Sequence, residues 1–170
     1  SEIILDHEKR RKIIISKFNS ICEAKKFKKN FNEKLIEEVI NLVENPHIIV
    51  GKFDKNFLKI PPEILTITMQ QHQRYFPLFD QHGTLTNFFL VVANLPDKKK
   101  YIKIGNEKVI KARLSDASFF WEKNKKQNLV KQVSKLKALT FFSGLGTIYD
   151  KTQRLRKLGS FISDDLNINK

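Results

Sequence analysis

The chain has 170 residues, of which 41% are hydrophobic, so it can bury a sizeable core and is not a disordered polycation. Lysine and arginine number 32 against 18 acidic residues, which gives a net charge of +14. This charge favours nucleic acid or an anionic membrane face as a partner. The alternative is that the charge reflects a compositional bias toward Lys, Asn and Ile spread over a whole proteome. No apolar run approaches the roughly 20 residues that span a bilayer, and the single Cys22 allows no intrachain disulfide. We therefore expect a soluble protein of a reduced, intracellular compartment.

The first part of the chain predicts two helices and a strand. Mixed three- and four-residue spacings of apolar residues predict a basic amphipathic helix over about 6–27. A second helix is expected to begin at Asn32 and to end before Pro46, because the residue that precedes a proline is disfavoured in the helical region. The short β-branched run from His47 to Phe53 predicts a strand.

The middle of the chain predicts a short helix and two strands. Pro61 and Pro62 favour the start of a helix through Met69, and residues 74–79 then become extended. Pro77 cannot donate a ladder hydrogen bond, so this strand is expected at a sheet edge or at an irregularity. After a turn, the strongly apolar run 87–93 predicts a central strand buried on both faces.

The last part of the chain predicts mainly helices. After a loop at Lys98 to Lys100, a long helix is expected over about 106–125, followed by a weaker helical pattern over 127–139. Another helix is expected to begin at Thr147, where Asp150 completes a pattern similar to a capping box. Together these elements predict an α+β fold with a mixed sheet flanked by helices and further helices at both ends.

Several kinds of chemistry lack the residues they require. Gly144 and Gly146 lack the third glycine and the preceding strand of a dinucleotide site, and no phosphate-binding loop is present. The four histidines lack metal-ligand spacing, so we expect no metal site. His72 is the best candidate for acid or base catalysis, with Asp116 or Glu107, but a histidine hydrogen-bonded at a helix-to-strand corner is the favoured interpretation.

Two groups of residues are candidates for function or for stabilising the fold. Dense polar residues beside apolar segments need partners, and they predict a structural polar network of His72, Gln73, Arg74, Asn106, Glu107, Arg113 and Asp116. Because lysines neutralise phosphates, the candidates for RNA binding are Lys98, Lys99, Lys100, Lys108, Lys111, Lys123, Lys125 and Lys126. Arg113 and Asp116 are three residues apart on one helix and can instead pair with each other.

A set of short motifs follows in a fixed order between Met69 and Leu158. They are His72–Pro77, Val92–Asn94, Gly105–Val109, Ala112–Ala117, Phe119–Glu122 and Leu145–Thr147, followed by Asp150, Lys151 and Arg154. Each motif is weak alone, but their order is specific, and together they resemble the β subunit of the bacterial heterotetrameric glycyl-tRNA synthetase.

The resemblance implies that the chain is an interior piece of such a subunit. It implies a basic helix over 1–30, an α+β core over 31–128 similar to the B3/B4 region of phenylalanyl-tRNA synthetase, and over 129–170 the start of a truncated HD-like helical domain. It also implies tRNA(Gly) and the α subunit as partners, in a cytoplasmic heterotetramer of two α and two β subunits, with no membrane. ATP and Mg are implied for the α subunit, and no cofactor or catalytic residue for this piece.

Two other roles stay open at this level. The core could hydrolyse mischarged tRNA, as an editing module that uses His72, Asp116 or Glu107, although glycine is the smallest amino acid and a steric sieve already excludes larger ones. Alternatively, its apolar helices could dock the α subunit. The favoured interpretation is a structural, tRNA-contacting module of a glycine-tRNA ligase without the adenylation site.

Overall fold

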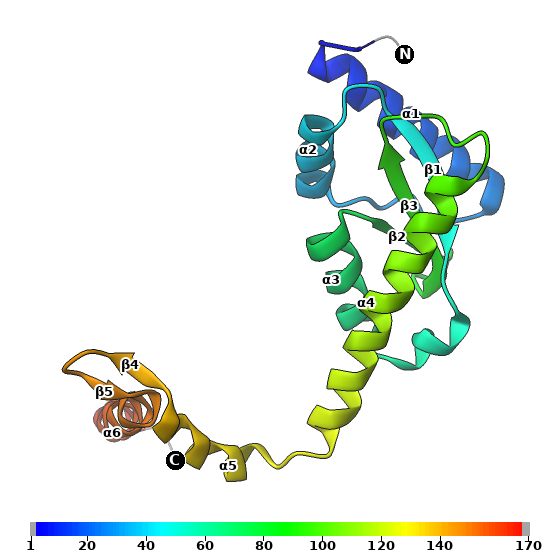
Figure 1. Ribbon diagram of the computed structural model, residues 1–170. Helices are drawn as coiled ribbons and strands as arrows, with labels where there is room; N and C mark the ends of the chain where they lie inside the picture. Colours follow the sequence, from blue (N-terminus) through cyan, green and yellow to red (C-terminus); the bar gives the residue numbers. More distant parts are fainter. Residues whose placement is uncertain (1–2, 168–170) are drawn as a thin grey trace. The chain divides into compact units, whose positions relative to one another are not determined.

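The computed structural model describes residues 3–167, and the chain divides between Trp121 and Glu122 into two compact units (Figure 1). The first unit is a three-stranded sheet with helices on both faces, and the second is a small β-hairpin with helices. The α+β class is therefore confirmed. The expected three-part division, with boundaries after residues 30 and 128, stays a prediction.

The first two helices form where the sequence predicts them. Helix α1 spans His7–Lys25, and the Asp6 carboxylate caps it by accepting hydrogen bonds from the backbone N–H groups of Glu8 (2.9 Å) and Lys9 (3.2 Å). Helix α2 spans Glu33–Leu42, and Asn32 caps it in the same way. Both helices present apolar stripes to one face of the sheet.

The sheet has the strand order β1-β3-β2, with β1 at His47–Lys52, β2 at Phe76–Phe79 and β3 at Leu85–Ala93. The predicted central position of β3 is confirmed, and so is the edge position of β2, whose register shifts between Pro77 and Phe79. Both pairings are antiparallel, in contrast to the mixed sheet expected from the sequence. A short hairpin loop joins β2 to β3, and such a loop connects only antiparallel neighbours.

Side chains of successive residues alternate between two cores, one on each face of the sheet. Ile48 and Val50 contact the core beneath α1 and α2, which is built around Phe18, Ile36 and Leu90. The other core lies beneath α3 and α4, and its fully buried members include Leu65, Met69, Phe89, Ile110 and Leu114. Residues of β3 belong to both cores, so this central strand is buried on both faces.

Two helix boundaries differ from the sequence predictions. Helix α3 spans Pro62–Gln73 and so continues beyond Met69, until Arg74 adopts a left-handed conformation with φ 58°. Helix α4 spans Tyr101–Lys125, beginning before the expected Asn106. The Asp97 carboxylate accepts hydrogen bonds from the N–H groups of Ile102 (3.0 Å) and Lys103 (2.8 Å), which stabilises this earlier start. A short 3-10 helix, η1 (Lys55–Lys59), precedes α3.

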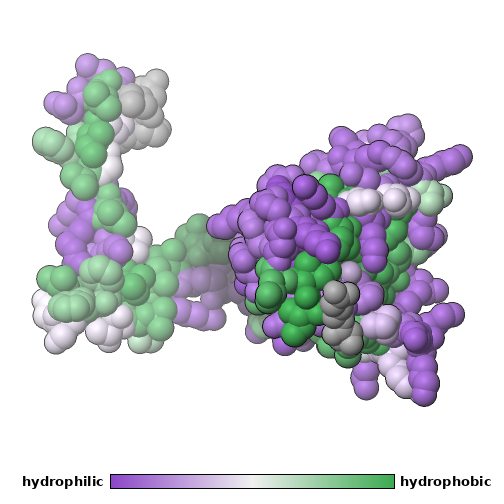
Figure 2. Space-filling model, turned by 90° about the horizontal axis from the view of Figure 1, so that it is seen from above, coloured by the Kyte–Doolittle hydropathy of each residue, from purple (hydrophilic) through white to green (hydrophobic). Residues whose placement is uncertain are grey.

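The second unit contains α5 (Leu129–Gln132), the 3-10 helix η2 (Val133–Ala138), a hairpin of β4 (Thr140–Phe142) and β5 (Gly146–Thr147), and α6 (Ile148–Asp165). The capping box of Thr147 and Asp150 is confirmed, with each side chain bonding the other residue's backbone N–H. No side chain of residues 122–167 is fully buried, and apolar surface lies beside hydrophilic surface there (Figure 2).

Candidate nucleic-acid interface

The outer face of α4 carries a row of exposed lysines. Lys100 precedes the first residue of the helix, and Lys108 and Lys111 follow at spacings of eight and three, which place all three on one side of the helix. The core-facing stripe of Ile110 and Leu114 lies on a different side and is fully buried. The α4 lysine face, defined as Lys100, Lys108 and Lys111, therefore points away from the core, and hydrophilic side chains project all round this unit in Figure 2.

The acidic residues of α4 have other partners. Glu107 accepts a hydrogen bond from the backbone N–H of Lys52 at 2.9 Å and lies 3.9 Å from Lys103 Nζ. Asp116 lies 3.9 Å from Arg113, as the helical spacing predicts, and both side chains are more than half exposed. Within residues 3–167 none of these acids forms an ion pair with the α4 lysine face, and Glu107 and Asp54 line the same pocket as Lys108 and Lys111.

The remaining lysine candidates lie on either side of this face. Lys98 and Lys99 are exposed in the loop before α4. Lys123 and Lys125 are exposed in the last turn of the helix, where Lys125 lies 3.6 Å from Glu122, and Lys126 follows. These three belong to the second unit.

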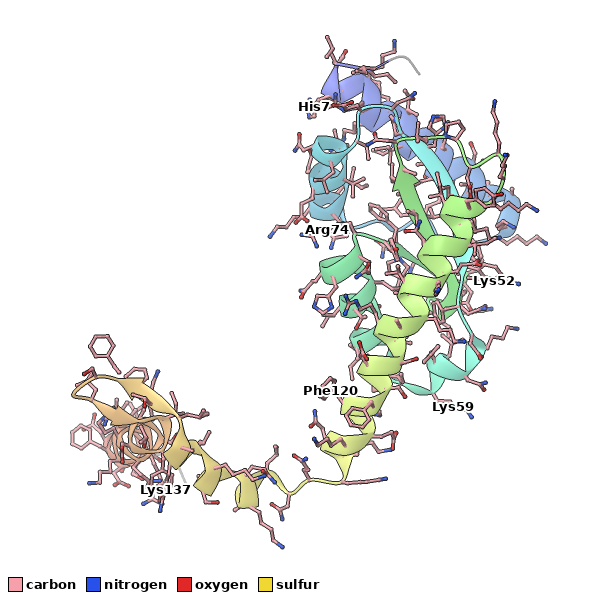
Figure 3. The ribbon with its side chains drawn as sticks, in the orientation of Figure 1. His7, Lys52, Lys59, Arg74, Phe120 and Lys137 are labelled. Carbon is pink, nitrogen blue, oxygen red and sulfur yellow. The ribbon has the colours of Figure 1, made fainter. Side chains whose placement is uncertain are left out.

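The residues of the expected polar network are divided among separate contacts. His72 is exposed in the last turn of α3 and Gln73 is half-buried beside it. Arg74 lies beside α2 in Figure 3, where its Nε is 2.8 Å from a carboxylate oxygen of Glu38, and its guanidinium also bonds the Gln71 carbonyl. No contact joins His72 to Asp116 or Glu107 within residues 3–167, so no acid-base pair forms there.

One contact links the helix-to-strand corner to the long helix. The Tyr75 hydroxyl donates to Asn106 Oδ1 at 2.5 Å, and Asn106 Nδ2 donates to the Ile102 carbonyl at 2.7 Å. The Tyr75 ring stacks on Phe89 with centroids 5.0 Å apart. Burial raises the pKa of Tyr75 to about 12, because the phenolate would lose its hydration.

This contact predicts a loss of stability at high pH. The unfolded chain releases the Tyr75 proton near pH 10, whereas the folded chain keeps it until about pH 12, so the stabilisation is complete below pH 10 and falls as the pH rises through this interval. Tyr75→Phe is expected to remove that part of the pH dependence. It should also cost about 1–2 kcal/mol at pH 8, because Asn106 loses its donor.

Urea unfolding at pH 8 to 11.5 measures both effects. Trp121 is the chain's one tryptophan and packs against the same core, so its fluorescence reports this unit. If the free energy of unfolding falls with pH above pH 10 as steeply in Tyr75→Phe as in the unchanged chain, the raised pKa of Tyr75 is contradicted.

Some residues with structural roles were not predicted from the sequence. Asn94 Oδ1 accepts hydrogen bonds from the N–H groups of Glu44 (2.7 Å) and Asn45 (3.3 Å), which fixes the turn before β1 to the end of β3. Arg10 donates to the carbonyls of Ile4 and Ile40 and so ties the start of the chain to α2. Asn94 belongs to a short motif that the sequence does single out, but its partners come from far away in the chain.

Neither a membrane-spanning helix nor a cluster of metal-ligating side chains is found among residues 3–167. No helix among residues 3–167 is both long and apolar enough to cross a bilayer. Nor does that part of the chain bring together three or more histidine, cysteine, aspartate or glutamate side chains in a way that could hold a metal ion. Cys22 is buried as a free thiol in the first core, where burial raises its pKa.

Comparison with known proteins identifies the family. The family model described as "Glycyl-tRNA synthetase beta subunit" matches residues 1–170. The glycine-tRNA ligase beta subunits of Dictyoglomus thermophilum and Coxiella burnetii are 44% and 42% identical to this chain over 168 residues, and that of Clostridioides difficile is 42% identical over 166. In each case 98% of this chain is covered but only 24% of the relative, so the chain spans about a quarter of their length.

These matches place the chain among the subunits of aminoacyl-tRNA synthetases. More closely, it belongs to the glycyl-tRNA synthetase beta subunit family. The resemblance noted from the motifs between Met69 and Leu158 is thereby confirmed.

Proposed function

We propose that this chain works within a glycine-tRNA ligase, which attaches glycine to tRNA(Gly) with ATP, as a structural and tRNA-contacting module that lacks the adenylation site. In this proposal the ligase is a cytoplasmic heterotetramer of two α and two β subunits, and ATP and Mg act at the α subunit. Family membership supports the ligase. The observation that carries the role of this module is the α4 lysine face, whose three exposed lysines form no ion pair within residues 3–167.

The geometry favours contact with the tRNA backbone over catalysis. Lysine is a point charge on a flexible stem and neutralises phosphates without reading bases. By contrast, an editing hydrolase would need His72 close to Asp116 or Glu107, and these three side chains have different surroundings: His72 is exposed on α3, Asp116 pairs with Arg113, and Glu107 bonds β1. Docking of the α subunit is the remaining alternative.

The test separates amino-acid activation from charging. In the intact ligase, Lys100→Gln with Lys108→Gln and Lys111→Gln is expected to leave glycine-dependent ATP–pyrophosphate exchange unchanged, because that reaction does not need this module. The kcat/KM for tRNA(Gly) should fall about tenfold or more, because about three phosphate contacts are removed. A control that removes two exposed lysines from η1, Lys55→Gln with Lys59→Gln, should change neither reaction.

Two results would contradict the proposal. If the rates of pyrophosphate exchange and of tRNA charging fall equally, the lysines act in amino-acid activation or in folding. If the rate of charging is unchanged, the lysines do not contact tRNA.

A further inference from the structure

The outer edge of β1 has backbone groups without partners. The Phe53 N–H donates to the Asn87 carbonyl at 3.0 Å, in line with the pairing of Gly51 with Phe89 and of Ile49 with Val91. In an antiparallel ladder hydrogen-bonded and non-hydrogen-bonded pairs alternate, so the odd-numbered residues of β1 bond to β3. The N–H and C=O groups of the even-numbered residues therefore point outward.

The two ends of this edge differ. At Lys52 the outward N–H is bonded to Glu107 Oε1, which closes that end. Ile48 and Val50 have no hydrogen-bond partner at the outer edge within residues 3–167. Their backbone lines a groove of about 520 Å³, with α1 on one side and the start of α4 on the other (Figure 1).

The groove is positively charged with an apolar floor. Lys17 comes from α1, and Lys100 and Lys103 from the start of α4. Asp97 also lines the groove, but its carboxylate is occupied by the backbone N–H groups that it caps. Burial and the nearby Lys17 both lower the pKa of His47, so this histidine is mainly neutral at pH 7.

We propose that this groove binds an extended, acidic segment of a second polypeptide of the ligase, which adds to β1 as a fourth strand of the sheet. The inference rests on the proposed function for the existence of a partner subunit. Unpaired N–H and C=O groups of an edge strand are the template for such addition. A peptide strand satisfies both groups, whereas phosphates of RNA would accept from the N–H groups but meet the carbonyl oxygens with repulsion.

The two faces of the sheet define the side chains that fit. The added strand would point alternate side chains toward α1, where it meets Lys17 and Ile21, and toward α4, where it meets Lys100 and Lys103. Acidic side chains are therefore expected at every second position, facing α4. Apolar or acidic side chains are expected between them.

Photocrosslinking in the intact ligase tests the proposal. Ser20 lines the groove and is exposed. Benzoylphenylalanine in its place would therefore crosslink to a segment that is bound in the groove. Mass spectrometry of the purified, irradiated complex is expected to find an acidic segment of another subunit attached there. An adduct within the same chain, an adduct to tRNA, or no adduct would overturn the proposal.

A pair of variants at one position tests the backbone pairing. Val50→Pro removes the outward N–H without removing a β1–β3 hydrogen bond, whereas Val50→Ala keeps that N–H. The crosslink should fall at least tenfold with proline and persist with alanine, while the Trp121 fluorescence of the 170-residue chain stays native in both. Equal yields in the two variants would overturn strand addition.

The charging assay keeps this inference separate from the proposed function. Lys108 and Lys111 do not line the groove, so if their replacement impairs charging but Ser20 yields no acidic adduct, the strand site fails while the tRNA contact stands. A crosslink from position 20 to tRNA would show that RNA lies in the groove, and it would contradict the proposal that a peptide binds there.

Discussion

Phe89→Ala is expected to lower the free energy of unfolding of the first unit by about 3–5 kcal/mol, the usual cost of removing a buried phenylalanine. Phe89 is fully buried in the central strand, with its ring stacked between Tyr75 at 5.0 Å and Phe53 at 6.5 Å. The cavity would lie between the sheet and the helices α3 and α4. Urea unfolding followed by Trp121 fluorescence measures the change, and a loss below 1 kcal/mol would contradict this account of the core.

The same ring explains the glycine opposite it, which provides a control. A Cβ at Gly51 would lie 2.4 Å from Phe89 Cζ, so Gly51→Ala should cost about 1–3 kcal/mol through overpacking. In the Phe89→Ala background this clash disappears, so the two changes should be strongly non-additive. By contrast, a Cβ at Gly105 in α4 meets nothing within 4 Å, and Gly105→Ala should stabilise the helix by up to about 1 kcal/mol.

The second large effect concerns RNA. Charge reversal by Lys108→Glu with Lys111→Glu is expected to weaken binding of tRNA(Gly) to the intact ligase by about tenfold or more, because each change replaces a phosphate partner with a repelling carboxylate. Both side chains are exposed and form no ion pair within the described residues, so the fold should be unaffected. Fluorescence anisotropy of labelled tRNA at constant salt measures the affinity.

A control with the same number of charge reversals at another place distinguishes a local contact with tRNA from an effect of the total charge. Lys55→Glu with Lys59→Glu changes the total charge equally on η1. An equal loss of affinity in this control would show that only the overall charge matters.

The main features of the fold follow from local patterns in the sequence. The apolar run of β3 predicts burial on both faces, and Pro77 predicts the edge position of β2, since both depend on neighbouring residues alone. The start of α4 was predicted too late because the apolar stripe begins after the cap that Asp97 provides. The β4–β5 hairpin was missed because its strands are very short, and its turn depends on Gly144 and Gly146, which have φ values of 81° and 79°.

The candidate site was less predictable because its contacts join distant segments. The apolar stripe of α4 predicts which side of the helix is buried, and so it predicts that the lysines on the other sides are exposed. By contrast, the partner of Arg74 is Glu38 on α2, which lies 36 residues earlier in the chain and could not be predicted from spacing. Likewise, Lys17 and Lys103 line one groove only because α1 and α4 lie on opposite faces of β1. Spacing along one helix did predict the Arg113–Asp116 pair.

The salt dependence of tRNA binding tests the central claim most directly. For the intact ligase, the logarithm of the affinity for tRNA(Gly) should fall linearly with the logarithm of the salt concentration. In the variant with Lys100, Lys108 and Lys111 replaced by glutamine, the slope should be shallower by about 2–3, since each phosphate contact contributes about 0.7–0.9. Identical slopes for the two proteins would contradict a contact between the α4 lysine face and tRNA.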